Sequence, residues 1–88
     1  MRVSAAIFIS FVLAGGPTLN LTGDAQPARC ELERRLTEAL MERGVASSGL
    51  VTVHFERGVW SVWHQGVVRV LGPRTCQEVA ALTAAILQ

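Results

Sequence analysis

Two cysteines, Cys30 and Cys76, stand about 46 positions apart in a chain of 88 residues. With only two cysteines, a single intramolecular disulfide can form. For a loop of this length the chain-entropy model gives a stabilisation of about 4 kcal/mol. That is as large as the roughly 3–5 kcal/mol that the hydrophobic core of a very small domain supplies. We therefore predict a Cys30–Cys76 disulfide and a compartment in which thiols oxidise.

Zinc is the alternative use of these thiols, because His54 and His64 complete a set of two cysteines and two histidines. No pair of them has the short spacing, C-x-x-C or H-x-x-x-H, that positions zinc ligands. A catalytic thiol needs a neighbouring group that activates it, and none is recognisable. The disulfide is favoured, and we expect neither a metal nor another cofactor.

The N-terminus has the layout of a secretory signal peptide. A positive start precedes an apolar run over residues 3–14, and the two glycines and the proline at 15–17 end this run. Cleavage fits after Ala14 or after Ala25. The second site is preferred, because the residues between the two sites have no other evident use. We therefore assign residues 1–25 to the signal peptide.

The remaining residues, 26–88, then form a small disulfide-closed domain that is secreted or periplasmic. An uncleaved membrane anchor is the alternative, because the charge-free stretch continues to Gly23. A spanning helix needs about 20 apolar residues, which is more than the apolar run alone provides. Contact with a membrane is expected only if this segment is retained.

The charge of the chain is nearly balanced, since eight basic and seven acidic side chains give a formal net charge of +1. Basic residues alternate with acidic ones, so the chain has no basic patch suited to nucleic acid. We expect the partner to be an unknown protein or a second copy of the chain, and not a nucleic acid.

The part after the signal peptide predicts an α+β domain with the order α-β-β-β-α. Residues 30–43 have an apolar stripe at helical spacing, and Gly44 ends this run. Three short runs rich in valine, separated by glycine turns, predict strands over residues 50–56, 60–64 and 67–71. We expect a three-stranded antiparallel sheet with two helices on one face.

A second helix is predicted over residues 76–87. Thr75 and Glu78 have the spacing of a capping box. Each cysteine then lies at the start of one of the two helices, where the disulfide can join them. The expected buried stripe of the first helix is Leu32, Leu36, Ala39 and Leu40. The expected buried stripe of the second helix is Val79, Leu82 and Ile86.

Two registers of the first hairpin compete, and they bury different tryptophans. A two-residue loop at Arg57-Gly58 pairs Phe55 with Trp60 and buries Trp60. A three-residue loop over residues 56–58 buries Trp63 instead and spares Arg57 a positive φ. We prefer the first register, because it keeps the serine and the arginine of these strands out of the core together.

The second hairpin is predicted to turn through a three-residue loop over residues 64–66, with the glycine in the left-handed position. This loop pairs Val62 with Val68 and Trp60 with Val70. All of these side chains then share the face that the helices cover.

The opposite face of the sheet is the best candidate for a binding site. Tryptophan and arginine are enriched at the centres of interfaces, and one of each is expected there. The alternative role of the exposed tryptophan is to shield the back of a thin sheet or to pair with a second copy. The side chains expected on this face are Thr52, His54, Ser61, Trp63 and Arg69.

A small hydrolase or toxin that uses His54 or His64 as a base is a less favoured class. Ser47-Ser48 lacks the Gly-x-Ser-x-Gly context of a nucleophile elbow, and paired catalytic carboxylates are not evident in the sheet. We therefore predict no enzyme but a binding or assembly module of the cell envelope or the secreted fraction. A membrane-tethered accessory subunit, held by an uncleaved N-terminal anchor, is the alternative.

Residues 69–82, RVLGPRTCQEVAAL, run from a strand through a cysteine into an alanine-rich helix. This stretch resembles the end of an uncharacterised cysteine-containing helix–strands–helix module of exported myxobacterial proteins, in which an earlier cysteine opens a helix as Cys30 does. The resemblance covers about residues 29–88. It implies a secreted or envelope location and brings no catalytic residues. In those proteins further sequence follows the module, so both a free-standing copy and a piece of a longer protein stay open.

Overall fold

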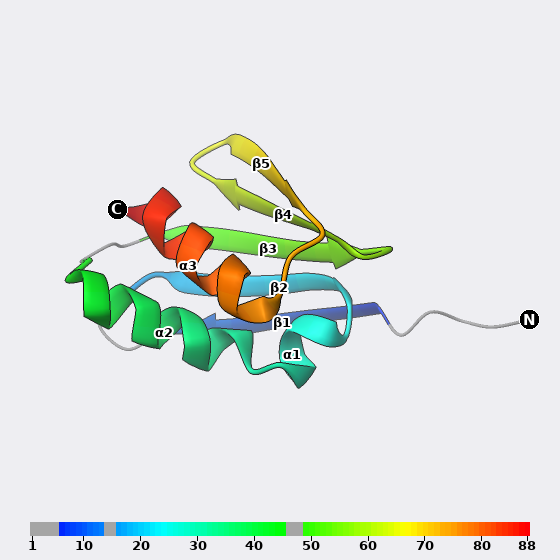
Figure 1. Ribbon diagram of the computed structural model, residues 1–88, viewed down its shortest axis with the longest axis horizontal. Helices are drawn as coiled ribbons and strands as arrows, with labels where there is room; N and C mark the ends of the chain where they lie inside the picture. The colour runs from blue at the N-terminus through cyan, green and yellow to red at the C-terminus, as the bar shows by residue number, and fades with distance from the viewer. Residues whose placement is uncertain (1–5, 14–15, 46–48) are drawn as a thin grey trace, which may run out of the picture.

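The computed structural model describes residues 6–13, 16–45 and 49–88. It has a five-stranded sheet, one short helix and two longer helices (Figure 1). The strands are β1 (Ala6–Val12), β2 (Thr18–Asp24), β3 (Leu50–Glu56), β4 (Val59–His64) and β5 (Val67–Gly72). The helices are α1 (Gln26–Arg29), α2 (Leu32–Arg43) and α3 (Cys76–Leu87).

The strands are ordered β1-β2-β3-β4-β5 across the sheet. Neighbouring strands are antiparallel except for β2 and β3, which are parallel. Parallel neighbours need a crossover connection, and α1 and α2 provide it. The α+β class is confirmed, whereas the prediction of a three-stranded antiparallel sheet is wrong because the sheet is mixed and has two more strands.

The two additional strands come from the segment that we assigned to a signal peptide. Leu19 and Leu21 of β2 have 0% exposure, and they alternate with polar residues as a strand with one buried face requires. The residues between the two cleavage sites therefore do have a use, and the reason for preferring cleavage after Ala25 does not hold. Cleavage itself stays a prediction, and Ala14 lies outside the described residues.

Helix α2 forms where the apolar stripe predicted it, and Leu32, Leu36 and Leu40 are buried, whereas Ala39 is only partly buried. Cys30 lies just before the helix, as the disulfide requires. Gly44 has a φ of 64° and donates its N–H to the carbonyl oxygens at the end of the helix. This left-handed cap favours glycine.

Helix α3 begins with the predicted capping box, in which Thr75 Oγ1 accepts from the backbone N–H of Glu78 and the Glu78 carboxylate accepts from the N–H of Thr75. The backbone N–H of Thr75, then the Thr75 side chain and the Arg74 charge, hold the pKa of the Glu78 carboxyl below its usual range.

The predicted buried stripe of α3 is wrong in two of its three positions. Leu82 and Ile86 are only partly buried. The helix packs mainly against α2, and the stripe that faces inward includes the small side chains Ala80, Thr83 and Ala84. The buried residues are Val79, Ala80, Thr83, Ala84 and Leu87.

The first hairpin has the preferred register. Phe55 lies opposite Trp60 across a two-residue turn at Arg57 and Gly58, and the two rings have centroids 4.5 Å apart. Trp60 is 1% exposed. Its Nε1–H donates to the carbonyl oxygen of Arg74 at 3.0 Å, which satisfies the polar atom of this core side chain.

The second hairpin does not have the predicted register. Its turn consists of two residues, Gln65 with φ 53° and Gly66 with φ 77°. The shorter loop places Val62 opposite Arg69 instead of Val68, and an irregularity follows between Trp60 and Ser61. Because side chains alternate along a strand, this slip of one residue moves each β5 side chain to the other face.

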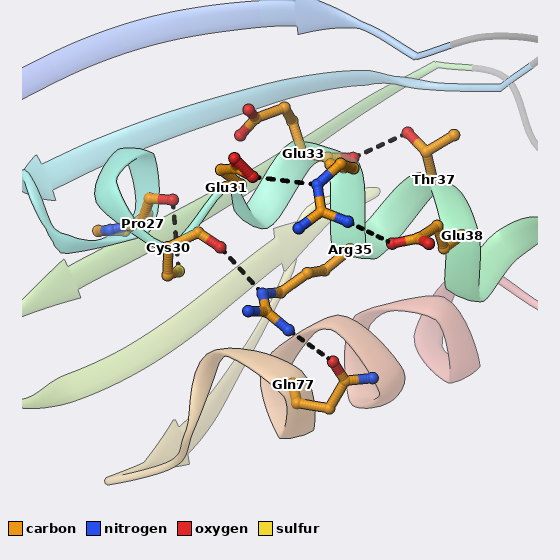
Figure 2. A network of polar contacts seen from close by, with 9 residues as sticks. Pro27, Cys30, Glu31, Glu33, Arg35, Thr37, Glu38 and Gln77 are labelled. Carbon is orange, nitrogen blue, oxygen red and sulfur yellow. Dashed lines mark hydrogen bonds and ion pairs between the residues drawn. The ribbon is translucent and has the colours of Figure 1, made fainter.

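Cys30 and Cys76 form the predicted disulfide, with 6.4 Å between their Cα atoms. It joins the segment before α2 to the first residue of α3. Figure 2 shows Arg35 reinforcing this junction: its Nε donates to the carbonyl oxygen of Cys30 and its Nη1 donates to Oε1 of Gln77, each at 2.9 Å. The disulfide indicates an oxidising, non-cytoplasmic environment.

The disulfide also removes the zinc alternative, because both thiols are consumed in it. Within residues 6–13, 16–45 and 49–88, no three histidine, cysteine or acidic side chains gather as a metal site would require.

Replacing Gly23 with alanine is expected to lower the free energy of unfolding by about 3 kcal/mol. Gly23 has a φ of 95°, and a Cβ there would collide with the carbonyl oxygen of Phe55 on the neighbouring strand. Gly44→Ala is the matched control, since its φ is also positive but its Cβ would meet nothing within 4 Å. It should cost only about 1 kcal/mol. Chemical denaturation measures both, and equal losses would contradict the close approach of β2 to β3.

Candidate functional site

In the described part of the chain, helices α2 and α3 cover one face of the sheet and the other face has no helix (Figure 1). We call the uncovered side the open sheet face. Directly paired residues point to the same side of a sheet, so the strand registers define its members. They are the even-numbered residues of β1, β2 and β3, the odd-numbered residues of β4, and Val68 and Val70 of β5.

The open sheet face gathers most of the large apolar side chains that water reaches. Nine such side chains are exposed in the described part of the chain, and strand alternation places seven of them on this face. Single exposed apolar residues are ordinary, but a contiguous group marks an interaction surface. The seven are Phe8, Val12, Leu50, Val59, Trp63, Val68 and Val70.

Four of the five predicted site residues lie together on the open sheet face. Thr52 is opposite Trp63, and His54 is opposite Ser61. Arg69 does not join them, because the slip of β5 turns it to the side that carries α3. There Arg69 and Ile86 line a separate depression of about 370 Å³. The prediction that Arg69 belongs to the binding face is therefore wrong.

Trp63 is the largest exposed side chain of the face, with 52% of its surface accessible. A depression of about 350 Å³ lies beside it. Leu50 and Thr52 line one side, and residues 64–66, the end of β4 and the turn after it, line the other. A large, rigid, half-exposed ring beside a hollow is the arrangement that an interface anchor has.

A polar group occupies the middle of the open sheet face. The Thr22 hydroxyl hydrogen-bonds with Nδ1 of His54 at 2.8 Å. Nε2 of the same ring lies 3.6 Å from Oε1 of Glu56. Thr22 and His54 are direct neighbours across the parallel pair β2 and β3, so the sheet fixes the orientation of the imidazole.

A hydroxyl beside an imidazole is one part of what acyl transfer needs, and oxyanion donors are the other. β2 and β3 are interior strands of the sheet, so their backbone N–H groups serve the ladders on both sides. The second histidine, His64, lies opposite Val51 on the helix-covered side. Ser47 and Ser48 lie outside the described residues. The arrangement can donate and accept hydrogen bonds to a docked surface.

Residues of the face that the sequence analysis missed come from two sources. Phe8, Asn20 and Thr22 fall in the segment assigned to a signal peptide, and Val68 and Val70 were expected in the core. The strict alternation of Thr18 to Thr22 with two leucines was a usable sign of a strand. No comparable local sign marks the slip of β5.

No family model matches the chain, and no curated protein and no solved structure matches it either. In the part that the structure describes, none of the helices has the length and apolar character that a membrane span requires.

Proposed function

We propose that this chain is a non-enzymatic binding or assembly module that acts outside the cytoplasm, in the cell envelope or the secreted fraction. Its binding surface is the open sheet face. The observation that supports this proposal most directly is that, of the nine large apolar side chains that are exposed among the described residues, seven lie on that one face. Burial of such a surface against a partner is favourable by roughly 25 cal/mol per Å² of apolar area.

The polar centre of the face supports a protein partner more than a small apolar ligand. Hydroxyl, amide and imidazole groups between two apolar borders resemble the mixture found in protein interfaces, where apolar anchors are accompanied by hydrogen bonds. The disulfide supports the location, because such bonds persist in oxidising compartments.

Capture of partners from the compartment where the chain naturally occurs is expected to depend on Trp63. Trp63→Ala should reduce partner binding at least about tenfold, since truncated aromatic anchors cost the most in interfaces. Met41→Ala is the matched control, because Met41 is 73% exposed but lies on α2. Quantitative mass spectrometry of the captured proteins measures both variants.

His54→Ala separates binding from catalysis in the same experiment. If the face only binds, the biological effect of this variant should fall no further than its capture of partners falls. Unchanged capture by Trp63→Ala, or loss of the biological effect in His54→Ala while capture is retained, would contradict the proposal.

A further inference from the structure

The composition of the open sheet face also indicates which kind of partner it binds. This inference rests on the proposed binding role of that face. We propose that the partner is a second copy of this chain, and that two copies bind open face to open face. The argument uses the distribution of apolar side chains, the placement of charge and the size of the face.

Apolar and polar side chains are arranged in bands that match themselves under two-fold symmetry. Apolar groups lie on β1 at one border of the face and on β4 and β5 at the other, with Phe8 at 71% exposure and Val70 at 69%, and Leu50 at the start of β3 is the exception. The inner strands β2 and β3 carry hydrogen-bonding groups such as Asn20 and Thr52. A two-fold axis that lies between the two faces and runs across the strands places each strand over its own copy, in antiparallel orientation. Apolar groups then meet apolar groups, and hydrogen-bonding groups meet their own kind.

Charge placement also permits self-association. Among the described open-face residues the only carboxylates are Asp24 and Glu56, and both lie at the end of the sheet where β2 and β3 finish. When the strands of the two copies run antiparallel, these acidic ends lie at opposite sides of the interface and do not repel. A strongly charged partner would find few groups to pair with.

The size of the face fits a weak dimer. Strands spaced about 4.8 Å apart, with a rise of about 3.3 Å per residue, give this sheet a face of roughly 20 by 20 Å. Because side chains roughen that surface, two faces together bury on the order of 1,000 Å², which is the lower limit for a specific interface. Twisted sheets stack well at about −30°. We therefore expect a dissociation constant in the micromolar range.

Sedimentation velocity of the full oxidised chain, from about 1 to about 500 μM, tests the inference because this range brackets a micromolar dissociation constant. The wild-type chain should shift from monomer to dimer within it. Trp63→Glu should weaken the dimer at least about 30-fold, as expected for an anchor that buries a charge. Trp63→Phe should retain the dimer, and Met41→Glu on α2 should leave it unchanged.

A wild-type chain that stays monomeric at the highest concentration overturns the inference. A dimer that persists in Trp63→Glu also overturns the inference. The contact between the copies would then lie elsewhere, for example at the edge of the sheet formed by β5. If circular dichroism shows that Trp63→Glu does not fold, Val70→Glu replaces it with the same expected result. The wild-type chain could also be monomeric while its capture of other proteins still depends on Trp63. That result would contradict the homodimer and agree with the proposed function.

Discussion

A chain that begins at residue 26 is expected to remain unfolded under conditions in which the full chain folds. It lacks β2, an interior strand whose Leu19 and Leu21 are fully buried. Burial of one leucine contributes roughly 1.5–3 kcal/mol, and both side chains belong to the same core cluster as Leu36 of α2. Without β2, the edge of β3 that faced it also loses its hydrogen-bond partners. The combined loss of stability exceeds about 5 kcal/mol, which is the whole stability of a marginal domain.

A chain that begins at Gly15 is the matched control. It lacks β1, which is an edge strand with one neighbour, and the buried Leu13 that follows β1, but it keeps the two fully buried leucines of β2. We expect it to fold with a lowered melting temperature. Two-dimensional amide NMR and thermal unfolding followed by circular dichroism compare the three chains, each with its disulfide oxidised. A dispersed spectrum and full-length stability for residues 26–88 would show that the first 25 residues are dispensable, as a cleaved signal peptide requires.

The truncations also show what the position of the natural N-terminus implies for the sheet. An intact mass that begins at Met1 or at Gly15 retains β2, whereas one that begins at Gln26 does not. If the chain recovered from its natural compartment begins at Gln26, the sheet of the exported protein has a different composition from the sheet of the full chain. Mass spectrometry of that material therefore decides which chain the binding experiments should use.

The elements that the sequence predicted well are those specified by neighbouring residues. The capping box of Thr75 and Glu78 needs only a spacing of three, and the alternation of β3 needs only its own seven residues. The disulfide followed from the cysteine count. In each case a local rule and the final fold agree, so no distant contact had to be known.

β1 was missed because one apolar run satisfies two rules, and β2 was missed because the residues after that run were assigned to the same signal peptide. A positive start, an apolar stretch and a small-residue exit describe a signal peptide, and the same stretch can form a strand. The parallel partner of β2 is β3, which follows only after α1 and α2. Pairing over that separation leaves no signature in either strand alone.

The candidate site was predicted in part for a similar reason. Thr52, His54, Ser61 and Trp63 were placed correctly by alternation and by the first turn. The second turn was expected to have three residues, with the glycine in the left-handed position. The observed two-residue turn puts Gln65 at a φ of 53°, which is uncommon for a residue with a Cβ. The fold accommodates that angle. Because the observed turn is one residue shorter than the expected one, Val68, Val70 and Arg69 each lie on the opposite face of the sheet from the one expected.

Removal of the disulfide is expected to cost about 4 kcal/mol of stability, because the bond closes a loop of 46 residues in the unfolded chain. For a domain of this size such a loss lowers the melting temperature by roughly 15–30 °C. The double variant Cys30→Ala/Cys76→Ala tests this without leaving buried hydroxyl groups, since both cysteines pack against the core. Thermal and urea unfolding of the variant and of the reduced wild type measure the loss.

Arg35→Ala separates the covalent link from the polar contacts around it. Arg35 bridges the same two segments through its hydrogen bonds to Cys30 and Gln77, so its loss removes noncovalent support and leaves the loop closed. These hydrogen bonds contribute about 1 kcal/mol to stability, which is well below the contribution expected of the disulfide. If the double alanine variant melts within about 2 °C of the oxidised wild type, a shift worth less than about 1 kcal/mol, the core alone holds α2 against α3. The disulfide would then have no stabilising role, and the stability of the domain would not require an oxidising compartment.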